Sequence, residues 1–283
     1  MRRRLDLELV RRGLVASRAH AHDVVARGAV LVGGAVADKP ARLVAESDAI
    51  VVERAGRRFV SRGGDKLEAA LERFAVAVAG RRCLDAGAST GGFSDCLLQR
   101  GAASVMAVDV GYGQLHPRIR ADRRVTVRER TNIRSLADSP DEPDEAFELI
   151  VADLSFISLT VVVPRLAGTL AAPGADLLLL VKPQFEVGHV EASRGRGVVR
   201  DPVLRRGALD KVASALTDAG ATIMGAMASP VLGPAGNAEY LLWARRPQRG
   251  VERPVAIDVD EALAAAVAGS PDSTDAASRP GDR

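Results

Sequence analysis

Residues 84–93, which read LDAGASTGGF, place a glycine-rich turn between a short apolar segment and a helical pattern. Strand, glycine-rich turn and helix form the first unit of a doubly wound α/β sheet, where the backbone passes close to a bound nucleotide. The glycines lack the GxGxxG spacing of dinucleotide-binding enzymes, and Asp85 stands two residues before the first of them. A carboxylate at this position would attract the cationic S-adenosylmethionine. It is less suited to a dinucleotide, whose pyrophosphate is negatively charged. The turn therefore predicts an S-adenosylmethionine site, with a purely structural turn as the alternative.

The chain beyond residue 65 alternates between strand-like and helix-like patterns, which is typical of a parallel sheet covered by helices. A helix should begin at Asp65, and the last one should span 260–269. Strands are expected at 82–86, 104–110, 125–129, 148–153, 175–182, 221–228 and 239–245, with helices near 92–100, 160–170 and 202–219. The Pro/Gly-rich turn at 229–237 is too short for a crossover helix, so the last strand should run antiparallel. This pattern predicts the α/β, class I (Rossmann-like) methyltransferase sheet.

Composition limits which other classes of protein, such as membrane, secreted or metal-binding proteins, the chain could belong to. The longest strongly apolar segment, Leu177–Val181, is far shorter than the roughly 20 residues of a membrane helix. No apolar segment follows the arginines at positions 2–4, so no signal peptide is expected. Cys83 and Cys96 have no metal-ligand spacing. We therefore expect a cytoplasmic protein without a metal site.

The first 64 residues form a basic module. Lys and Arg outnumber Asp and Glu there, whereas the remainder is mildly acidic and the whole chain has a net charge of +3. Helices are expected at 5–14 and from Ser17 to Arg27, followed by strands at 30–32, 35–36 and 48–52. Gly33-Gly34 favours a hairpin between the first two strands. A basic module of this kind indicates a polyanionic partner, with a merely solvated surface as the alternative.

This module resembles an S4 RNA-binding domain through Ser17-Arg18, the ARGAV segment at 26–30, VGG at 32–34 and DAIVV at 48–52. We expect an S4-like domain at 1–56, a linker at 57–64, a catalytic domain at 65–268 and a disordered tail at 269–283. Phe59-Val60 in the linker is interpreted as a small packing contact, with direct RNA contact as the alternative.

Four polar residues are expected to meet at the carboxyl edge of the sheet. Asp153 and Lys182 each end a strand, Glu239 starts the antiparallel strand, and Lys66 lies in the helix that leads into the sheet. Only four of the 39 basic residues are lysines, so a lysine at such a position suggests a task that arginine cannot perform. Taken singly, each could be a solvated strand-end residue.

Cofactor contacts are expected along the same edge. Asp109 ends the second strand of the sheet, where a carboxylate can accept hydrogen bonds from ribose hydroxyls. The expected cofactor-binding residues are Asp85, Gly87, Ser89, Thr90, Gly91, Gly92, Phe93, Asp109, Val110, Asn132, Asp153 and Leu154.

The motifs SRGGDKL, LDAGASTGGF, AVDVGYGQL, RTNIRSL, VADLSFISL, LVKPQFE and GNAEYLLW together make residues 1–268 resemble the TlyA-type ribosomal RNA 2′-O-methyltransferases. That family joins an S4 domain to an FtsJ-like catalytic domain. The resemblance implies a catalytic tetrad at Lys66, Asp153, Lys182 and Glu239, and cytidine riboses of 16S and 23S rRNA as substrates. Arg57-Arg58-Phe59-Val60 corresponds to the family's interdomain tetrapeptide, with Phe59 where relatives carry tryptophan.

We interpret Lys182 as the base that accepts the proton of the ribose 2′-hydroxyl, because burial and a second nearby cation favour a neutral amine. Asp153 and Glu239 would orient the lysines, and Lys66 would position the hydroxyl or a phosphate. The Gly/Arg-rich segment 188–206 is predicted to clamp RNA. Expected RNA contacts are Arg3, Arg4, Arg11, Arg12, Arg18, Arg27, Arg57, Arg62, Arg194 and Arg196.

Other functions remain open at this point. The chain could be a non-catalytic RNA-binding ribosome assembly factor, a haemolysin that acts on membranes, or a small-molecule methyltransferase. The low aromatic content and the basic module argue against the last of these. A monomer is favoured.

Overall fold

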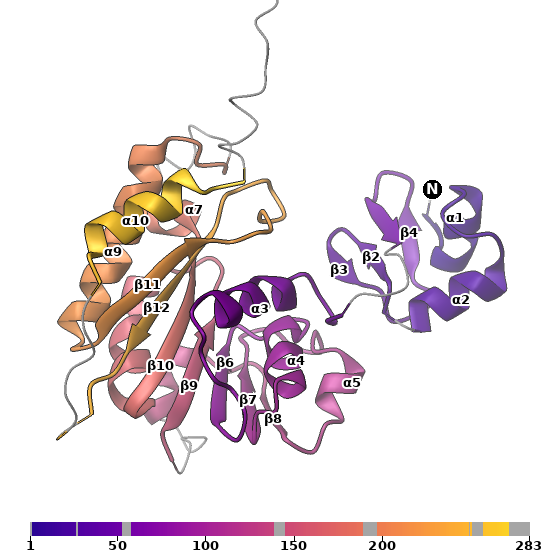
Figure 1. The fold of residues 1–283 in the computed structure, drawn as a ribbon. Coiled ribbons are helices and arrows are strands. Elements are labelled where there is room, and N and C mark those ends of the chain that lie inside the picture. The colour runs from indigo at the N-terminus through magenta and orange to yellow at the C-terminus, as the bar shows by residue number, and fades with distance from the viewer. Residues whose placement is uncertain are drawn as a thin grey trace, which may run out of the picture. The chain divides into compact units, whose positions relative to one another are not determined.

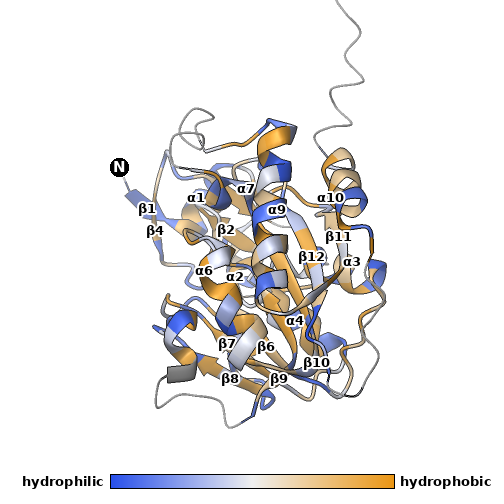
Figure 2. Cartoon of the chain, turned by 90° about the vertical axis from the view of Figure 1, so that its left-hand side faces the viewer, coloured by the Kyte–Doolittle hydropathy of each residue, from blue (hydrophilic) through white to orange (hydrophobic). Residues whose placement is uncertain are grey.

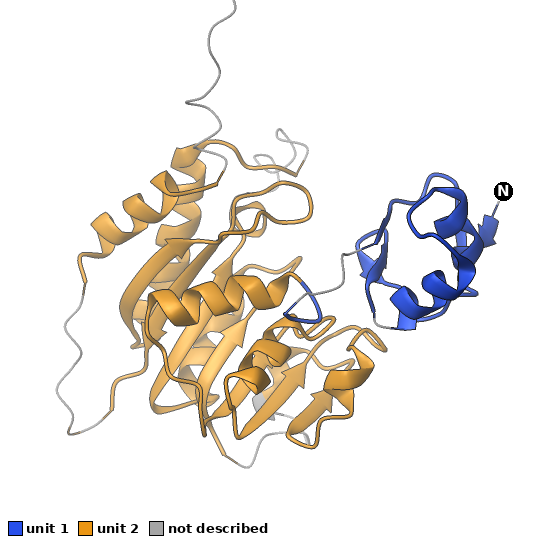
Figure 3. Cartoon of the chain, turned by 45° about the vertical axis from the view of Figure 1, so that its right-hand side comes forward, with its two compact units in different colours: residues 1–61 blue, residues 62–283 orange. Residues whose placement is uncertain are grey.

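The computed structural model describes residues 2–26, 28–52, 58–138, 145–188, 197–248, 250 and 257–271. They belong to two compact units, residues 1–61 and 62–283, and the division falls inside the linker expected at 57–64 (Figure 3). Arg27, Arg57, Arg194, Arg196 and residues 272–283 of the expected tail lie outside the described residues.

Unit 1 contains the two expected helices, α1 (Leu5–Arg11) and α2 (Arg18–Ala26). The Ser17 hydroxyl caps α2 by accepting a hydrogen bond from the His20 N–H at 3.2 Å, as its position predicts. The antiparallel sheet β3-β2-β5 comprises Ala35–Val36, Val30–Val32 and Ile50–Val52. Apolar residues of both helices and of these strands form its core.

One strand pair of unit 1 was not expected. Residues Arg2–Arg4 form β1 and pair antiparallel with β4 (Leu43–Ala45), so that Arg3 lies opposite Val44. Three successive arginines carry no strand pattern, and pairing with a distant segment decides their conformation.

Unit 2 is built on a sheet with the strand order β11-β12-β10-β9-β6-β7-β8 (Figure 1). The strands are β6 (Arg82–Ala86), β7 (Ser104–Val108), β8 (Val125–Arg128), β9 (Phe147–Ala152), β10 (Ala171–Val181), β11 (Thr222–Ala228) and β12 (Tyr240–Arg245). Strands β10, β9, β6, β7 and β8 run parallel, whereas β12 is antiparallel to both β10 and β11. The predicted class I methyltransferase sheet with its closing hairpin is therefore confirmed.

The main helices also lie where the sequence predicts them: α3 (Gly63–Arg73), α4 (Gly92–Gln99), α9 (Pro202–Asp218) and α10 (Val259–Ala268). The helix expected at 160–170 is divided into α6 (Leu159–Val163) and a π-helical turn, η2 (Pro164–Thr169). The division falls at Pro164, which has no N–H for a helical hydrogen bond. Three short elements were not predicted: α5 (Pro117–Arg120), η1 (Ile133–Asp138) and α7 (Pro183–Glu186).

The core of unit 2 gathers around β9 and β10, which Figure 2 colours as hydrophobic. The C-terminal segment belongs to this core as far as Ser270, which is fully buried, and its hydroxyl lies 2.7 Å from the Tyr240 hydroxyl. Ser270 was expected in a disordered tail, and this packing beside β12 corrects that expectation. Within the described residues, no helix is both long enough and apolar enough to cross a membrane.

Candidate active site

The glycine-rich turn brings the end of β6 close to the end of β9. Gly87 has a φ of +85°, and a Cβ atom placed on it would lie 2.7 Å from the Asp153 carbonyl oxygen. The Asp153 N–H in turn donates to the Ala86 carbonyl at 3.0 Å. Only glycine fits this close approach. The turn thus holds Asp153 at the carboxyl edge of the sheet.

Asp109 organises the neighbouring part of the edge, just beyond β7. Its carboxylate accepts hydrogen bonds from the Ser89 N–H at 2.8 Å and from the Gly111 N–H at 2.7 Å. Each oxygen retains a lone pair that can accept from a hydroxyl. A cavity of about 530 Å³ opens here. It is lined by Gly87, Ser89, Val108, Asp109, Val110, Gly111, Gln114, Thr131, Asn132, Ile133, Asp153, Leu154, Ser155, Phe156 and Ile157. We call it the cofactor cavity.

Asp85 lies behind this cavity rather than in its lining. The side chain is fully buried, and its Oδ2 accepts a hydrogen bond from the Ser94 hydroxyl of α4 at 2.6 Å. Burial, together with the Asp153 and Asp109 carboxylates, raises the pKa of Asp85 to about 7. The acid that the sequence places two residues before the first glycine is therefore oriented toward α4.

Lys66 and Glu239 form a closed ion pair. The Lys66 Nζ lies 2.5 Å from the Glu239 Oε2, and their side chains are 8% and 1% exposed. Lys66 lies in the first turn of α3, and Glu239 immediately precedes β12. The Glu239 Oε1 accepts no hydrogen bond from any described residue. This pair joins the helix that enters the sheet to the antiparallel strand.

Lys182 and Asp153 form a second, more open pair. The Lys182 Nζ lies 2.5 Å from the Asp153 Oδ1, with side chains 11% and 22% exposed, and it donates to the Ser155 hydroxyl at 2.8 Å. Lys182 follows the buried strand β10, and Asp153 follows its neighbour β9. Parallel strands ending side by side therefore place this amine and this carboxylate together.

Lys182 lines a second cavity, of about 820 Å³. It is lined by Ser155, Phe156, Ile157, Ser158, Lys182, Gln184, Phe185, Val187, Gly197, Pro234, Ala235, Asn237 and Glu239. We call it the substrate cavity. It shares Ser155, Phe156 and Ile157 with the cofactor cavity, so the segment 155–157 separates the two.

Phe156 is the most unusual residue of that segment. It is 92% exposed and has a φ of +65°, which a non-glycine residue rarely adopts. Its ring lies 5.3 Å from the ring of Phe185, which also lines the substrate cavity. A strained, exposed aromatic ring between two cavities indicates a contact surface for a planar ligand.

The predicted site residues divide into two groups. Of the expected cofactor residues, Gly87, Ser89, Asp109, Val110, Asn132, Asp153 and Leu154 line the cofactor cavity, whereas Asp85, Thr90, Gly91, Gly92 and Phe93 do not. The expected tetrad is brought together as two lysine–carboxylate pairs. Sequence analysis missed the roles of Ser155, Phe156 and Phe185 in the walls, although the VADLSFISL and LVKPQFE motifs contain them.

In unit 1, the arginines expected to bind RNA surround two buried carboxylates. Asp6 is fully buried and accepts hydrogen bonds from Arg4 at 3.0 Å and from Arg18 at 2.9 Å, with His22 at 3.2 Å. The Arg4 side chain, followed by Arg18 and His22, holds the pKa of the Asp6 carboxyl well below its usual range. Arg4 and Arg18 remain exposed beyond these bonds.

The buried Glu8 carboxylate accepts hydrogen bonds from Arg11 and Arg12. These bonds lower the pKa of Glu8 to about 2. Arg12 also donates to the carbonyl oxygens of Ala45, Glu46 and Asp48, and its side chain is 21% exposed. These bonds use most of the donors of Arg12 within the domain. Among the other expected RNA contacts that the structure describes, Arg3 and Arg62 are exposed.

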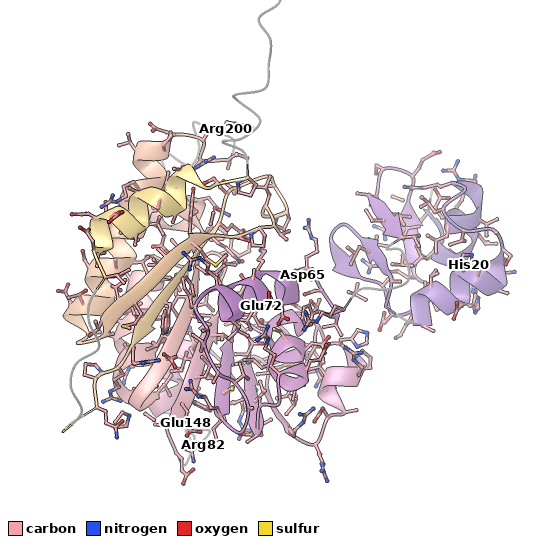
Figure 4. The ribbon with its side chains drawn as sticks, in the orientation of Figure 1. His20, Asp65, Glu72, Arg82, Glu148 and Arg200 are labelled. Atoms are coloured by element: carbon pink, nitrogen blue, oxygen red, sulfur yellow. The ribbon has the colours of Figure 1, made fainter. Side chains whose placement is uncertain are left out.

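Figure 4 labels charged residues at opposite ends of unit 2. Arg82 and Glu148, near the beginnings of β6 and β9, lie together at one end, where the Arg82 N–H donates to the Glu148 carboxylate at 2.9 Å. Arg200 lies at the other end. The cavities belong to the end where the parallel strands finish, which is where open α/β sheets bind ligands.

Comparison with known proteins agrees with this geometry. The model of the FtsJ-like methyltransferase family matches residues 59–246, and that of the S4 domain matches residues 3–50. The 16S/23S rRNA (cytidine-2′-O)-methyltransferase TlyA of Mycobacterium tuberculosis is 53% identical over 245 residues, covering 86% of this chain and 90% of the relative.

Two further relatives carry a hemolysin name. Hemolysin A of Brachyspira hyodysenteriae is 39% identical, covering 84% of this chain and 98% of its own length. A solved structure from Streptococcus thermophilus with a hemolysin name matches with a TM-score of 0.72 and 34% identity over 98% of both chains.

Proposed function

This chain belongs to the FtsJ-like methyltransferase family, in the branch that joins this domain to an S4 domain, and from that membership we infer that it is an S-adenosylmethionine-dependent enzyme that methylates the 2′-hydroxyl of cytidine in ribosomal RNA. The observation that carries the inference is the position of the Lys182–Asp153 pair. Asp153 lines the cofactor cavity, and Lys182 lines the substrate cavity that adjoins it. A proton acceptor stands where a methyl donor and a hydroxyl would meet.

The cofactor cavity suits S-adenosylmethionine in its size, in the hydrogen-bond acceptors that line it and in its negative charge. Asp109 can accept hydrogen bonds from ribose hydroxyls, and Asp153 contributes negative charge beside a cation. The close approach of Gly87 to the Asp153 backbone holds Asp153 in the lining of this cavity. When bound, this cofactor supplies an electrophilic methyl group on a sulfonium cation. Asp85 is fully buried and outside the lining of this cavity, so it would not contact the cofactor.

The substrate cavity fits a nucleoside that has left its base stack. Phe156 and Phe185 offer aromatic surface to the base, and Lys182 and Glu239 offer charge to the ribose at the floor. Enzymes that modify nucleotides within folded RNA extrude the target into such a pocket. Stacking on an aromatic ring contributes about 1–3 kcal/mol per base.

Lys182 acts as the base in this proposal. A 2′-hydroxyl is a weak nucleophile, so a side chain would have to accept its proton during methyl transfer. Asp153 and the Ser155 hydroxyl hold the amine in place, and Asp153 stabilises the ammonium that forms. Lys66 is paired with Glu239, which lines the substrate cavity, and would keep that carboxylate in position. Positioning supplies much of the remaining acceleration.

Unit 1 would bind the phosphate backbone of rRNA. Arg4 and Arg18, both held by Asp6, present oriented guanidinium groups at the surface. Guanidinium groups recognise phosphate in a bidentate manner and carry little sequence information. The M. tuberculosis relative is described as acting on both 16S and 23S rRNA, and we propose the same dual specificity and a cytoplasmic location with the ribosomal subunits.

The test is transfer of labelled methyl groups to isolated small and large ribosomal subunits, assayed separately. Label should be found on the ribose, shown by resistance of the adjacent phosphodiester bond to alkali. Labelling of both subunits supports dual specificity, and labelling of one narrows the substrate. RNA binding without labelling of either would favour an assembly factor instead. Leakage of protein-free liposomes, assayed in parallel, would favour the hemolysin activity that some relatives' names imply.

A further inference from the structure

The turn between β11 and β12, residues 229–238, forms one wall of the substrate cavity. It is tied to itself by hydrogen bonds from the Gly233 N–H to the Asn237 carbonyl at 2.8 Å and from the Gly236 N–H to the Gly233 carbonyl at 2.9 Å. The Ser229 N–H also donates to the Glu239 carbonyl at 2.8 Å. The turn is therefore a compact unit that ends directly at a residue of the expected tetrad.

Asn237 connects this turn to a second segment. The side chain is 1% exposed. Its Nδ2 donates to the Gly197 carbonyl at 2.8 Å, and its Oδ1 accepts from the Val199 N–H at 2.9 Å. Exchanging the two amide atoms would oppose like groups at both ends, so the bonding fixes the orientation. Both polar atoms of the buried Asn237 amide thus bond to the backbone of residues 197–199.

The segment 197–199 lies within the Gly/Arg-rich segment 188–206, shortly before α9, and Gly197 lines the substrate cavity. Val199 is buried, and its carbonyl accepts a hydrogen bond from the Arg205 Nε at 2.8 Å. Buried side chains therefore hold both backbone groups of Val199. Removing the Asn237 amide would leave one buried N–H and one carbonyl without partners.

Gly233 has a different relation to the same site. A Cβ placed on Gly233 would lie 2.4 Å from the Glu239 Oε1 and 3.1 Å from its Cδ, so the carboxylate would have to move. The φ of Gly233 is outside the left-handed region, and an alanine there would not strain the backbone. The displaced atom is the end of a side chain, so the fold would tolerate the change while the Glu239–Lys66 alignment would not.

We propose that the 229–238 turn positions two parts of the substrate cavity at once, with Asn237 holding the Gly197–Val199 wall and Gly233 leaving the space in which the Glu239 carboxylate stays aligned with Lys66. Asn237 and Gly233 are thus positioning residues. This proposal rests on the function inferred above. It assigns them separate kinetic effects, because the wall contacts RNA before reaction whereas the carboxylate acts during it.

The first test is Gly233→Ala. We expect kcat for rRNA methylation to fall by about 10- to 100-fold, because small misplacements of catalytic groups have effects of this size. The KM for RNA should stay near that of the unaltered protein, and the thermal unfolding midpoint should fall by no more than it does in Glu239→Gln, because both substitutions disturb the same buried pair. Gly207→Ala in α9 is the matched control, since a Cβ there meets no atom within 4 Å. A Gly233→Ala enzyme with unchanged kcat would overturn the part assigned to Gly233.

The second test is Asn237→Ala together with Asn237→Asp. Both should raise the KM and the Kd for RNA by about tenfold, with a smaller change in kcat. Asp keeps the acceptor for the Val199 N–H but opposes an oxygen to the Gly197 carbonyl, so it should not rescue binding. Asp176→Asn is the control, because Asp176 is equally buried but lies in β10 opposite Arg245, at the far end of β12 from the turn. Asp176 is bonded to Arg81, Trp243 and Arg245. This substitution should lower the unfolding midpoint and leave the KM unchanged.

The outcomes separate this proposal from the one on which it rests. An unaltered protein that methylates neither ribosomal subunit contradicts the proposed function. An active protein in which both Asn237 variants keep normal RNA affinity contradicts the role of Asn237 alone. Kd values for RNA, measured by fluorescence anisotropy, test Asn237 without any turnover.

Discussion

The two lysine–carboxylate pairs at the carboxyl edge of the sheet have the same composition but different surroundings. Lys66 and Glu239 are 8% and 1% exposed, and only Glu239 lines one of the two cavities, whereas Lys182 and Asp153 are 11% and 22% exposed and both line a cavity. Lys182 also donates to a serine hydroxyl. A group that exchanges a proton with a substrate must be reachable by it. An enclosed pair can instead hold elements together and supply a fixed field. The difference assigns chemistry to the open pair and positioning to the closed one.

Lys182→Arg should have the largest effect. Arginine keeps the positive charge beside Asp153 but does not release its proton, so it cannot accept one from the 2′-hydroxyl. We expect kcat/KM for rRNA to fall by about 10²- to 10⁴-fold, the range that general bases contribute. Binding of S-adenosylmethionine, measured by calorimetry, should change little. If the variant transferred methyl groups nearly as fast as the unaltered enzyme, Lys182 would not be the base.

Glu239→Gln tests the closed pair through stability. The substitution leaves the Lys66 ammonium buried without its counter-ion, and breaking a buried pair in this way costs about 3–5 kcal/mol. Asp153→Asn, at the more exposed pair, should cost less. Urea unfolding of both variants in the absence of ligands measures the difference. Equal losses would mean that the two pairs do not differ in the way proposed.

The sequence predicts the sheet and the edge at which these pairs lie, but not how the pairs form. Buried strands such as β10 are marked by continuous apolar residues, and the short turn before β12 determines its direction. Asp153 and Lys182 could therefore be placed together from their strand ends alone. The enclosure of Glu239 depends on the Lys66 side chain of α3 and on the backbone of Gly233 in the 229–238 turn. No periodicity in the chain encodes contacts between such distant segments.

The same limit explains the features that the sequence analysis missed or misplaced. Asp85 was expected to face the cofactor because it precedes the glycines, yet side chains alternate along a strand and its own points toward Ser94 of α4. The strand β1 at Arg2–Arg4 exists only through its pairing with β4. A local contact with α4 decided the first case, and pairing with a distant segment decided the second.

Asp85 extends the comparison to a buried carboxylate that bonds to a hydroxyl instead of a lysine. Burial raises its pKa to about 7 from the ordinary value of 3.8, so between these values the folded protein holds a proton that the unfolded chain has lost. The free energy of unfolding should therefore fall with rising pH by about 1.4 kcal/mol per pH unit in that window.

Asp85→Asn removes this dependence because the amide stays neutral. Urea unfolding of the ligand-free protein at pH 5 and pH 8 should show a smaller loss of stability in the variant than in the unaltered chain. Ser94→Ala is a useful companion, since it removes the hydrogen bond but leaves the carboxyl group in place. An identical pH dependence in Asp85→Asn would show that the carboxylate is charged throughout.

Unit 1 repeats the contrast between an enclosed and an open ion pair on a smaller scale. Arg12 is bonded to Glu8 and to three carbonyl oxygens, whereas Arg18 is bonded to Asp6 and its side chain is 57% exposed. Arg12→Ala should lower the stability of the domain by about 1–3 kcal/mol, through lost bonds to buried partners, and leave the RNA affinity of the folded protein unchanged.

Arg18→Ala should do the reverse. Loss of one phosphate contact should weaken RNA binding uniformly across sequences and reduce the slope of log K against log salt by about 1. Fluorescence anisotropy over a range of salt concentrations gives both quantities, and thermal unfolding of the full chain gives the stability. If Arg12→Ala reduced the salt slope as much as Arg18→Ala, both arginines would contact phosphate, and enclosure would not distinguish a structural cation from a binding one.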